Sequence, residues 1–531
     1  MGLNRRPRNP ELASQAYAQG WWTSQTLADS LRDAAQQTPD RLVLADDTTR
    51  LDCRTLYRDA ASLAHAMLER LPIGSVVSFI LPNWHEAAHI YLAATLAGMV
   101  AHPILPSLRD HELRYMLADV DSRMVFIPGV LRSHDYRAML ARVTAQLRRP
   151  PHVVVVRDDP GPFIAYESLH GSNSTQPLPT LDPDAVRMVL YTSGTTGTPK
   201  AVLHTHNSIH AVVRQIGLHW RIEPGDSFLV PSPISHIGGS LYAFECPLLL
   251  GARAVLMERW EPDAAVRLAR EERCTHMAGA TPFLAQMLAA AQRAGTRLPD
   301  LKVFICGGAS VAPSLIRAAA EHFTNTAVTR VYGSSEVPVI TVGAPDRSDL
   351  AHAADTDGKV GIAEVRLIDS SGAPAAEGEV RVRGPQMLLG YLHPEDEADV
   401  FDAEGYFRTG DLARWSDGDY LTISGRLKDI IIRNGENISP KEIEDILSTH
   451  PDIAEVTIVG LPDDRTGERA CAVIIPKGNA KPDVESLRTH LTGLGVAAFK
   501  IPERVEIWSA LPKNDAGKIL KHRVRALLLQ S

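Results

Sequence analysis

The order of predicted strands and helices indicates an α/β protein with a large N-terminal domain of mostly parallel αβ layers. A small β-barrel-like part and a small α+β C-terminal domain follow. Three observations predict this fold: strands and helices alternate over the first 430 residues or so, strands crowd together after about residue 361, and a new helix–strand unit begins near residue 428. The chain has 531 residues, and single hydrophobic cores stop growing near roughly 250–300 residues.

The first part of the large domain reads as buried strands separated by helices. A strand is expected at residues 76–81, a helix at about 85–97 with Asn83 as its N-cap, and a strand at 100–105. Further buried strands are expected at 124–127, 153–156, 188–191, 254–257, 303–306 and 328–332. Such alternation is typical of parallel sheets covered by helices.

The next part is rich in strands without helices between them. Strand-like segments occur at 363–369, 379–383 and 420–424, and Gly and Asp turns separate them. This pattern predicts a small barrel or an antiparallel sheet.

The last hundred residues read as a separate α+β unit. Ser439, Pro440 and Glu442 have the spacing of a capping box with Pro at the first helical position. Strands are expected at 455–459, 470–475 and 504–508, with helices near 483–494 and from about 518. We place the domain boundary at Lys428, which gives domains of residues 1–427 and 428–531.

The net charge limits which partners the protein can be expected to bind, and the cysteines indicate the compartment in which it works. Lys and Arg number 55 against 63 Asp and Glu, and the net charge of −8 argues against nucleic acid as the main partner. The five cysteines form no CxxC pair, which favours buried reduced thiols in a cytoplasmic protein over disulfides or zinc. The longest uncharged run, 87–107, contains Pro103 and Pro106 and predicts a buried helix and strand, with no membrane span.

A loop rich in Gly and Thr, residues 191–200, carries the strongest signal for a ligand. Two Gly allow a tight turn with exposed N–H groups, and the hydroxyls and a terminal Lys suit the oxygens of a polyphosphate. The spacing is not that of a Walker A loop. A flexible surface turn is the alternative, but the position after a strand favours phosphate binding. The expected ligands are Thr192, Ser193, Gly194, Thr195, Thr196, Gly197 and Lys200.

This loop resembles the phosphate loop of the acyl-adenylate-forming (AMP-binding) superfamily, which includes acyl- and aryl-CoA synthetases, peptide-synthetase adenylation domains and beetle luciferases. Six further segments resemble that family's motifs in the same order. They are residues 233–239, 307–309 with 331–336, 378–391, 406–412, 425–429 and 511–518. The resemblance covers almost the whole chain and implies a reaction in two steps. A carboxylate attacks the α-phosphorus of ATP to give an acyl-adenylate, and a thiol then displaces AMP.

The resemblance also assigns roles to single residues. It makes Lys518 the lysine of a mobile C-terminal domain that bridges the carboxylate and the α-phosphate, and an ammonium on a flexible stem suits that role. Asp411 would accept both ribose hydroxyls, Arg426 would reach the ribose or phosphate, and Glu336 with Thr192 would bind Mg²⁺. The adenine slot would contain Gly308, Ala309, Ser310, Tyr332, Gly333 and Ser334. On local grounds alone, each of these could equally be a turn or surface residue.

His236 falls at the family's gate between the acyl pocket and the thiol tunnel, although a lone His is more often a packing residue. Lys428 falls at the hinge about which the C-terminal domain would turn. That rotation would withdraw Lys518 and present the 433–437 segment, where Gly435 would line the thiol tunnel. The expected wall of the acyl pocket consists of His236, Ile237, Gly238, Gly239, Ala278, Gly279 and Val337.

The pocket segments are small and apolar, which favours an apolar acyl group, linear or cyclic. Ile237 stands where amino-acid-activating relatives have an Asp, so a free α-amino group would lack its partner. The start of the chain resembles medium-chain, cyclohexanecarboxylate and aryl-acid ligases, and a polycyclic acid stays open. Only 13 residues follow Lys518, and none forms a carrier attachment site, so CoA is favoured as acceptor. A separate carrier protein, release of the adenylate, a luciferase-like oxygenase and a non-catalytic nucleotide-binding protein are the alternatives.

Overall fold

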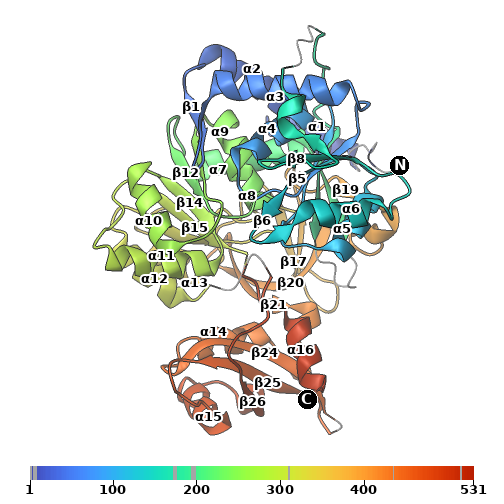
Figure 1. Ribbon diagram of the computed structural model, residues 1–531. Coiled ribbons are helices and arrows are strands. Elements are labelled where there is room, and N and C mark those ends of the chain that lie inside the picture. The colour runs from blue at the N-terminus through green and yellow to red at the C-terminus, as the bar shows by residue number, and fades with distance from the viewer. Residues whose placement is uncertain are drawn as a thin grey trace.

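The computed structural model describes residues 3, 9–171, 176–192, 199–308, 311–434, 436–463, 465–514 and 517–530. Figure 1 shows a large upper body, coloured blue to orange, and a smaller orange-red lobe below it that ends in α16. Strand β21 lies at the junction of the two. The body contains two large sheets and one small antiparallel sheet, and the lobe contains a sheet of its own.

The first large sheet has seven strands in the order β16-β15-β14-β12-β13-β1-β2. All neighbours pair in parallel except β2, which returns antiparallel on β1. The strands are β1 (Leu42–Ala45), β2 (Arg50–Asp52), β12 (Ser227–Val230), β13 (Arg253–Leu256), β14 (His276–Gly279), β15 (Val303–Gly307) and β16 (Ala327–Val331).

The second large sheet has eight strands in the order β19-β11-β10-β4-β3-β5-β8-β9. Strands β10, β4, β3, β5, β8 and β9 are parallel, while β11 and β19 add antiparallel at one edge. The strands are β3 (Val76–Phe79), β4 (Val100–Pro103), β5 (Ser122–Pro128), β8 (His152–Val156), β9 (Ile164–Ala165), β10 (Val186–Thr192), β11 (Lys200–Thr205) and β19 (Gly390–Tyr391), and a short hairpin pairs β6 (Val130–Leu131) with β7 (His134–Asp135).

Helices fill the space between the two sheets and cover their outer faces. In β5, Met124 and Phe126 join the core that both sheets share with α2, α3, α4 and α7, while Val125 and Ile127 pack toward α5 and α6. The helices α10 to α13 cover the other face of the first sheet. Strands buried on both faces explain the continuous apolar runs of the sequence.

The helices of the body have the following bounds: α1 (Pro10–Ala18), α2 (Leu27–Gln37), α3 (Cys53–Leu68), α4 (His85–Leu96), α5 (Asp110–Asp119), α6 (Tyr136–Thr144), η1 (Tyr166–Leu169), α7 (His206–His219), α8 (Ile237–Ser240), the π-helical turn η2 (Leu241–Glu245), α9 (Cys246–Leu249), α10 (Pro262–Glu271), α11 (Thr281–Arg293), α12 (Pro313–His322), α13 (Leu350–Asp355) and η3 (Pro394–Glu397).

Asn83 does not cap α4, contrary to the prediction. The N-cap is Trp84, and no side chain caps this helix. The Asn83 amide instead donates to the carbonyls of Val230 and Ser232, both at 3.0 Å, and its Oδ1 accepts from the Ile234 amide at 3.1 Å. A buried amide that satisfies three backbone groups of another loop gains more than one exposed cap would supply.

The β-rich part is an open antiparallel sheet in the order β17-β18-β20-β21, so it takes the second of the two forms that its pattern allowed. The strands are β17 (Glu364–Ile368), β18 (Glu377–Arg383), β20 (Phe407–Ser416) and β21 (Tyr420–Arg426). The register places Asp411 of β20 opposite Arg426 of β21.

The lobe begins after the short turn η4 (Leu427–Asp429), and its strands pair only with one another among the described residues. One face of its sheet carries α14 and α15, and the other carries α16. The elements are β22 (Ile431–Arg433), β23 (Glu436–Ile438), α14 (Pro440–Leu447), β24 (Ile453–Asp463), β25 (Gly467–Pro476), α15 (Val484–Gly493), η5 (Ala498–Lys500), β26 (Arg504–Ile507) and α16 (Lys521–Gln530).

The capping box predicted for α14 does not form. Ser439 is the N-cap and Pro440 follows it, but the Ser439 side chain makes no cap hydrogen bond. Its hydroxyl donates to the carbonyl of Ser424 in β21 at 2.5 Å, which links the lobe to the body. A tertiary partner has displaced the local one.

The cysteine prediction is confirmed as far as burial goes: all five thiols are buried and free. Among the described residues, no helix has the length and apolar character needed to cross a membrane.

Candidate active site

The carboxyl ends of four parallel strands, β12, β14, β15 and β16, meet at one edge of the first sheet. Residues that the sequence singled out end or follow each strand there: 233–239, Gly279, Gly308 and 332–336. Many of these residues are half-buried. Ligands of open α/β sheets bind at this edge, outside the carboxyl ends of the strands.

Asp411, Tyr332 and Arg426 meet at this edge. Asp411 is 6% exposed; its Oδ2 accepts from the Tyr332 hydroxyl at 2.8 Å and its Oδ1 accepts from Arg426 Nε at 2.6 Å. Burial and the neighbouring Asp411 carboxylate raise the pKa of Tyr332 well above its usual value, so its phenol stays a donor. Each carboxylate oxygen has two lone pairs, and one on each remains for a ribose hydroxyl.

Gly308 leaves an open face beside this cluster. Its φ is +81°, and an added Cβ would meet no atom within 4 Å. Gly333 is instead tightly packed, because an added Cβ would lie 2.5 Å from the Val339 amide nitrogen. The amide of Ser334 donates to the carbonyl of Val337 at 3.1 Å, which closes the turn after Tyr332. Ala309 and Ser310 lie outside the described residues.

Thr192 and Glu336, the two expected Mg²⁺ ligands, come together from the two sheets. The Thr192 hydroxyl lies 3.4 Å from Glu336 Oε1, which also accepts from the Tyr391 hydroxyl at 3.0 Å. Half-exposed oxygen donors of this kind fit Mg²⁺, a hard cation. Tyr391 is a contact that we did not assign, although it ends one of the recognised segments.

Lys200 lies at the end of the predicted phosphate loop, and its ammonium points to β19 and η3. Its Nζ donates to the carbonyl of Asp396 at 3.1 Å and lies 5.2 Å from the Tyr391 ring centroid. The loop residues Ser193, Gly194, Thr195, Thr196 and Gly197 lie outside the described residues.

Lys518 projects from the lobe into a cleft of about 620 Å³ that Arg426 and Lys428 also line. Its turn is fixed by Asn514, whose Oδ1 accepts from the Lys518 amide at 2.8 Å. Loss of solvent and the Arg426 guanidinium lower the pKa of Lys518, and the Asp411 carboxylate partly offsets this. An added Cβ at Gly517 would lie 3.2 Å from Pro282 Cγ, so this turn of the lobe rests against the start of α11.

The residues expected to form the acyl wall come from three places: residues 236–239 follow β12, Ala278 and Gly279 end β14, and Val337 follows β16. His236 is the N-cap position of α8, and a Cβ at Gly239 would lie 2.1 Å from the Pro233 carbonyl oxygen. Gly238 is half-exposed, with only Tyr242 near its missing Cβ, at 3.7 Å. Val337 is fully buried among other apolar residues, so it contributes no open surface, and Ala278 is 5% exposed. The assignment of this wall stays a prediction.

Lys428 lies in the turn η4 between β21 and β22, where loss of solvent and the Arg426 guanidinium lower its pKa. This position in the linker is compatible with the predicted hinge. Gly435, the predicted tunnel residue, lies outside the described residues.

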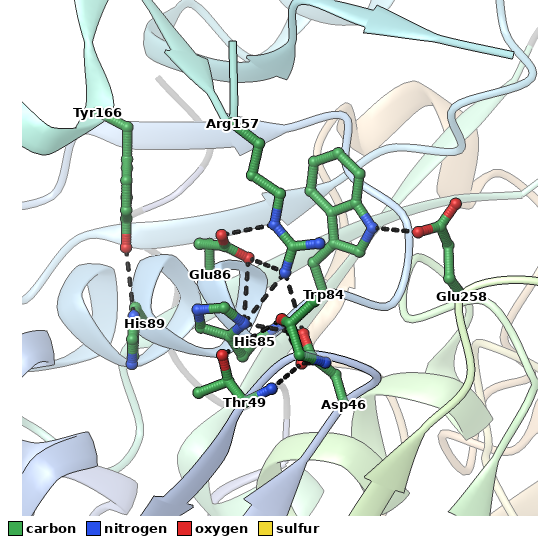
Figure 2. Close-up of polar contacts among 10 residues, drawn as sticks. Asp46, Thr49, Trp84, His85, Glu86, His89, Arg157, Tyr166 and Glu258 are labelled. Carbon is green, nitrogen blue, oxygen red and sulfur yellow. Dashed lines mark hydrogen bonds and ion pairs between the residues drawn. The ribbon is translucent and has the colours of Figure 1, made fainter.

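A second group of possible metal ligands lies elsewhere, where Asp46, His85 and Glu86 converge. Figure 2 shows the guanidinium of Arg157 between them, with Nη2 3.0 Å from Asp46 Oδ2 and 2.7 Å from Glu86 Oε2. Burial opposes ionisation of Asp46, but hydrogen bonds from His85 and the Thr48 amide hold its pKa below the usual value. Arg157 already supplies the positive charge, so this cluster is a structural network that joins β1, α4 and β8.

Comparison with known proteins decides the family. Residues 31–392 match the model of the AMP-binding enzyme family, and residues 442–518 match that of the AMP-binding enzyme C-terminal domain. The chain belongs to the AMP-binding enzyme family. It is an AMP-forming acid–thiol ligase that uses ATP.

Full-length relatives agree with this assignment. The chain is 34% identical over 524 residues to the medium-chain fatty-acid–CoA ligase of Escherichia coli, covering 96% of this chain and 91% of that protein. It is 30% identical over 536 residues to the 2,3-dihydroxybenzoate-AMP ligase of Bacillus subtilis, covering 98% and 96%. The crystal structure of ATP-bound MatB from Rhodopseudomonas palustris superposes with a TM-score of 0.84 at 26% identity, covering 94% and 98%.

Proposed function

We propose that this ligase is an acyl-CoA synthetase that joins an apolar carboxylic acid to CoA through an acyl-adenylate. The observation that carries the proposal is the cleft between body and lobe that Lys518 lines together with Arg426, whose guanidinium in turn bonds to Asp411. A lysine that a separate domain brings to the nucleotide site can offset negative charge when a carboxylate attacks the phosphates of ATP.

In the first step, a carboxylate oxygen attacks the α-phosphorus and the bond to pyrophosphate breaks. The Lys518 ammonium offsets the charge that builds up between carboxylate and phosphate, while Asp411 holds the ribose and Gly308 leaves room for the base. Thr192 and Glu336 would hold Mg²⁺, which offsets charge on the phosphates when bound.

In the second step, the thiol sulfur attacks the acyl carbon and AMP leaves with the electron pair. We propose that the lobe turns about Lys428 between the steps, which withdraws Lys518 and brings the 433–437 segment with Gly435 to the thiol. His236, at the start of α8, would stand between the acyl wall and the thiol path.

CoA is favoured because the E. coli relative is named a CoA ligase. Buried thiols without disulfides fit a cytoplasmic enzyme.

The acid we propose is apolar and medium-sized, either linear or cyclic. Ile237 offers no carboxylate to an α-ammonium group, and Gly238 adds neither bulk nor charge to the wall.

A second candidate is a stand-alone adenylating enzyme that passes the acyl group to a carrier protein or stops at the adenylate. The observation that favours it is the full-length match to a relative named an AMP ligase.

Acid-dependent exchange of labelled pyrophosphate into ATP tests the first step, with an acid panel that covers C4 to C14 linear, cyclohexane and aryl acids. The same panel is then run with CoA while AMP and thioester are measured. Exchange followed by stoichiometric AMP and thioester supports the CoA ligase. Exchange without CoA turnover supports the second candidate, and no exchange with any acid contradicts both.

A further inference from the structure

A fully buried ionic cluster joins β10, α4 and the end of the turn η2. Arg187 of β10 pairs with Glu245 at the end of η2, with Nη2 and Oε1 2.6 Å apart. The Tyr91 hydroxyl of α4 donates to the same Oε1 at 2.5 Å and accepts from Arg187 Nη1 at 2.7 Å. Arg187 is 2% exposed, and Tyr91 and Glu245 are 0% exposed.

Stability is a weak explanation for this cluster. Removing two charges from water costs about as much as their attraction returns, and apolar side chains of equal volume often do as well. Arg187 Nε and Glu245 Oε2 also lack a hydrogen-bond partner among the described residues, which adds to the cost. Buried ionic groups that persist at such a cost are candidates for fixing a specific conformation.

The conformation in question is a π-helical turn. The amide of Cys246 bonds to the carbonyl of Leu241, five residues back, and Glu245 closes this turn. The turn continues directly from α8, which holds Ile237, Gly238 and Gly239. Such π turns are rare, but those that occur are often found at functional sites. The extra residue in the turn rotates the following side chains by roughly 100° about the helix axis.

The elements that the cluster joins carry the two halves of the proposed site. Arg187 lies on β10, which ends at Thr192 immediately before the phosphate loop. Glu245 lies on the helical segment of the acyl wall. Inside the turn, Tyr242 stacks on Phe228 of β12 with centroids 5.3 Å apart, so the segment is held on both sides. The ion pair therefore connects the strand of the phosphate loop to the acyl wall.

We propose that Glu245, held by Arg187 and Tyr91, is a positioning residue that keeps the turn Leu241–Glu245 in its π form. It thereby sets the depth of the acyl pocket and hence the size of acid accepted. This inference rests on the proposed function, because it takes residues 236–239 as the acyl wall. Without the hydrogen bonds that the residue 245 oxygen accepts from Arg187 and Tyr91, the turn relaxes toward α-helical geometry, and Leu241 and its neighbours move relative to the phosphate loop.

The test compares acid-size profiles of folded variants. The double variant Arg187→Met/Glu245→Met removes both charges at once and leaves neither one buried alone. We expect the ratio of kcat/KM for C12 and C6 acids in pyrophosphate exchange to change at least tenfold, while the KM for ATP changes less than about twofold. Glu245→Gln keeps an oxygen that accepts from Tyr91 and Arg187, and we expect it to retain the wild-type ratio within about threefold.

A folded double variant with an unchanged acid ratio would overturn the proposal, because a merely structural pair lowers the melting temperature without altering selectivity. A crystal structure of that variant with the Cys246–Leu241 bond intact would overturn it as well. Where the double variant does not fold, Tyr91→Phe replaces it in the test. This variant removes one hydrogen bond to Glu245 and leaves both charges in place, and an unchanged ratio of kcat/KM for C12 and C6 acids counts against the proposal. Wild-type protein inactive on every acid would instead contradict the proposed function.

Discussion

At the residue scale, Lys518 offers the sharpest separation of the two half-reactions. We expect Lys518→Ala to lower pyrophosphate exchange by roughly 10²–10³-fold, the usual effect of removing one group that stabilises transition-state charge. Thioester formation from supplied acyl-adenylate should fall less than about threefold. Lys513→Ala is the matched control, because Lys513 is in the same loop but pairs with Glu455 at 2.6 Å. Equal loss in both half-reactions would contradict the alternation of the lobe.

The lowered pKa of Lys518 predicts an alkaline limit to adenylation. Only the ammonium form offsets negative charge, so activity is present below this pKa and is lost as pH rises through it. The kcat/KM for ATP reports the free enzyme, so its alkaline limb should lie below the value of about 10.4 for an ordinary lysine.

Lys428→Gln removes one of the positive neighbours that depress this pKa. The limb should then move to higher pH. A limb that stays in place in a folded variant would mean that another group limits the rate.

Gly238 and Gly239 provide a matched pair for testing the acyl wall. A side chain at Gly238 meets only Tyr242 at 3.7 Å, so Gly238→Val should fold and lower kcat/KM for the largest accepted acids by at least tenfold while sparing short acids. A side chain at Gly239 would clash with the Pro233 carbonyl at 2.1 Å, so Gly239→Ala should lower the melting temperature. Any loss of activity should then be the same for every acid. Exchange assays with thermal denaturation distinguish the two, and equal acid profiles for wild type and Gly238→Val would refute the wall assignment.

At the element scale, buried strands such as β3, β5, β8, β10, β15 and β16 were predicted. Strands β12 and β14, which also end at the candidate site, were not predicted, and the two expected side-chain caps did not form. Strands such as β5 and β8 are buried on both faces, so their apolar runs are continuous. Such a run can be identified as a strand without knowing how it pairs with its neighbours. Asn83 and Ser439 have the right local pattern for a cap, but each found a partner in another element: the loop after β12 and the end of β21. A local pattern carries no information about such partners.

The same limit applies to the site. The recognised segments pointed to Asp411, Arg426 and Tyr332, and the structure brings these three side chains into contact, while their roles toward ATP stay predictions. The bond from the Tyr391 hydroxyl to Glu336 joins residues 55 positions apart and has no local signal. Arg187 and Glu245 are 58 positions apart, and no local sequence pattern indicates that they pair.

The network in Figure 2 joins the ends of three elements, and Arg157 supplies its positive charge. We expect Arg157→Met to lower the free energy of unfolding by roughly 2–4 kcal/mol, below the full value for a buried pair because the Arg157 side chain is 26% exposed. Asp46, His85 and Glu86 would then form a three-ligand site, so millimolar Zn²⁺ or Co²⁺ should raise the melting temperature of the variant but not that of the wild type.

Arg157→Met/His85→Gln is the control for that metal effect. It should lose the metal response and keep the destabilisation. A variant whose melting temperature ignores both ions would show that the three side chains do not converge without Arg157.

At the scale of the whole molecule, the lobe rests against the body with Gly517 against Pro282 and Lys518 in the cleft that Arg426 lines, and we propose that this is the orientation for adenylation. The proposed cycle needs the lobe to leave this orientation before the thiol can attack. Locking it should therefore separate the half-reactions without removing any catalytic group.

A disulfide between Pro282→Cys and Gly517→Cys supplies such a lock, and the native thiols do not compete because all five are buried. Cys at position 517 accepts a φ of +79° at a cost of about 1–2 kcal/mol, which the lock tolerates. We expect the oxidised variant to retain pyrophosphate exchange within about threefold and to form thioester at least a hundredfold more slowly.

Dithiothreitol should restore thioester formation, and each single-cysteine variant should be insensitive to oxidation. If the oxidised double variant forms thioester at the wild-type rate, the acyl group reaches the thiol without rotation of the lobe. Lys428 would then be an ordinary linker residue rather than a hinge. If exchange is lost as well, the orientation seen here is not the one in which the adenylate forms, and the place of Lys518 in the cleft with Arg426 would need another explanation.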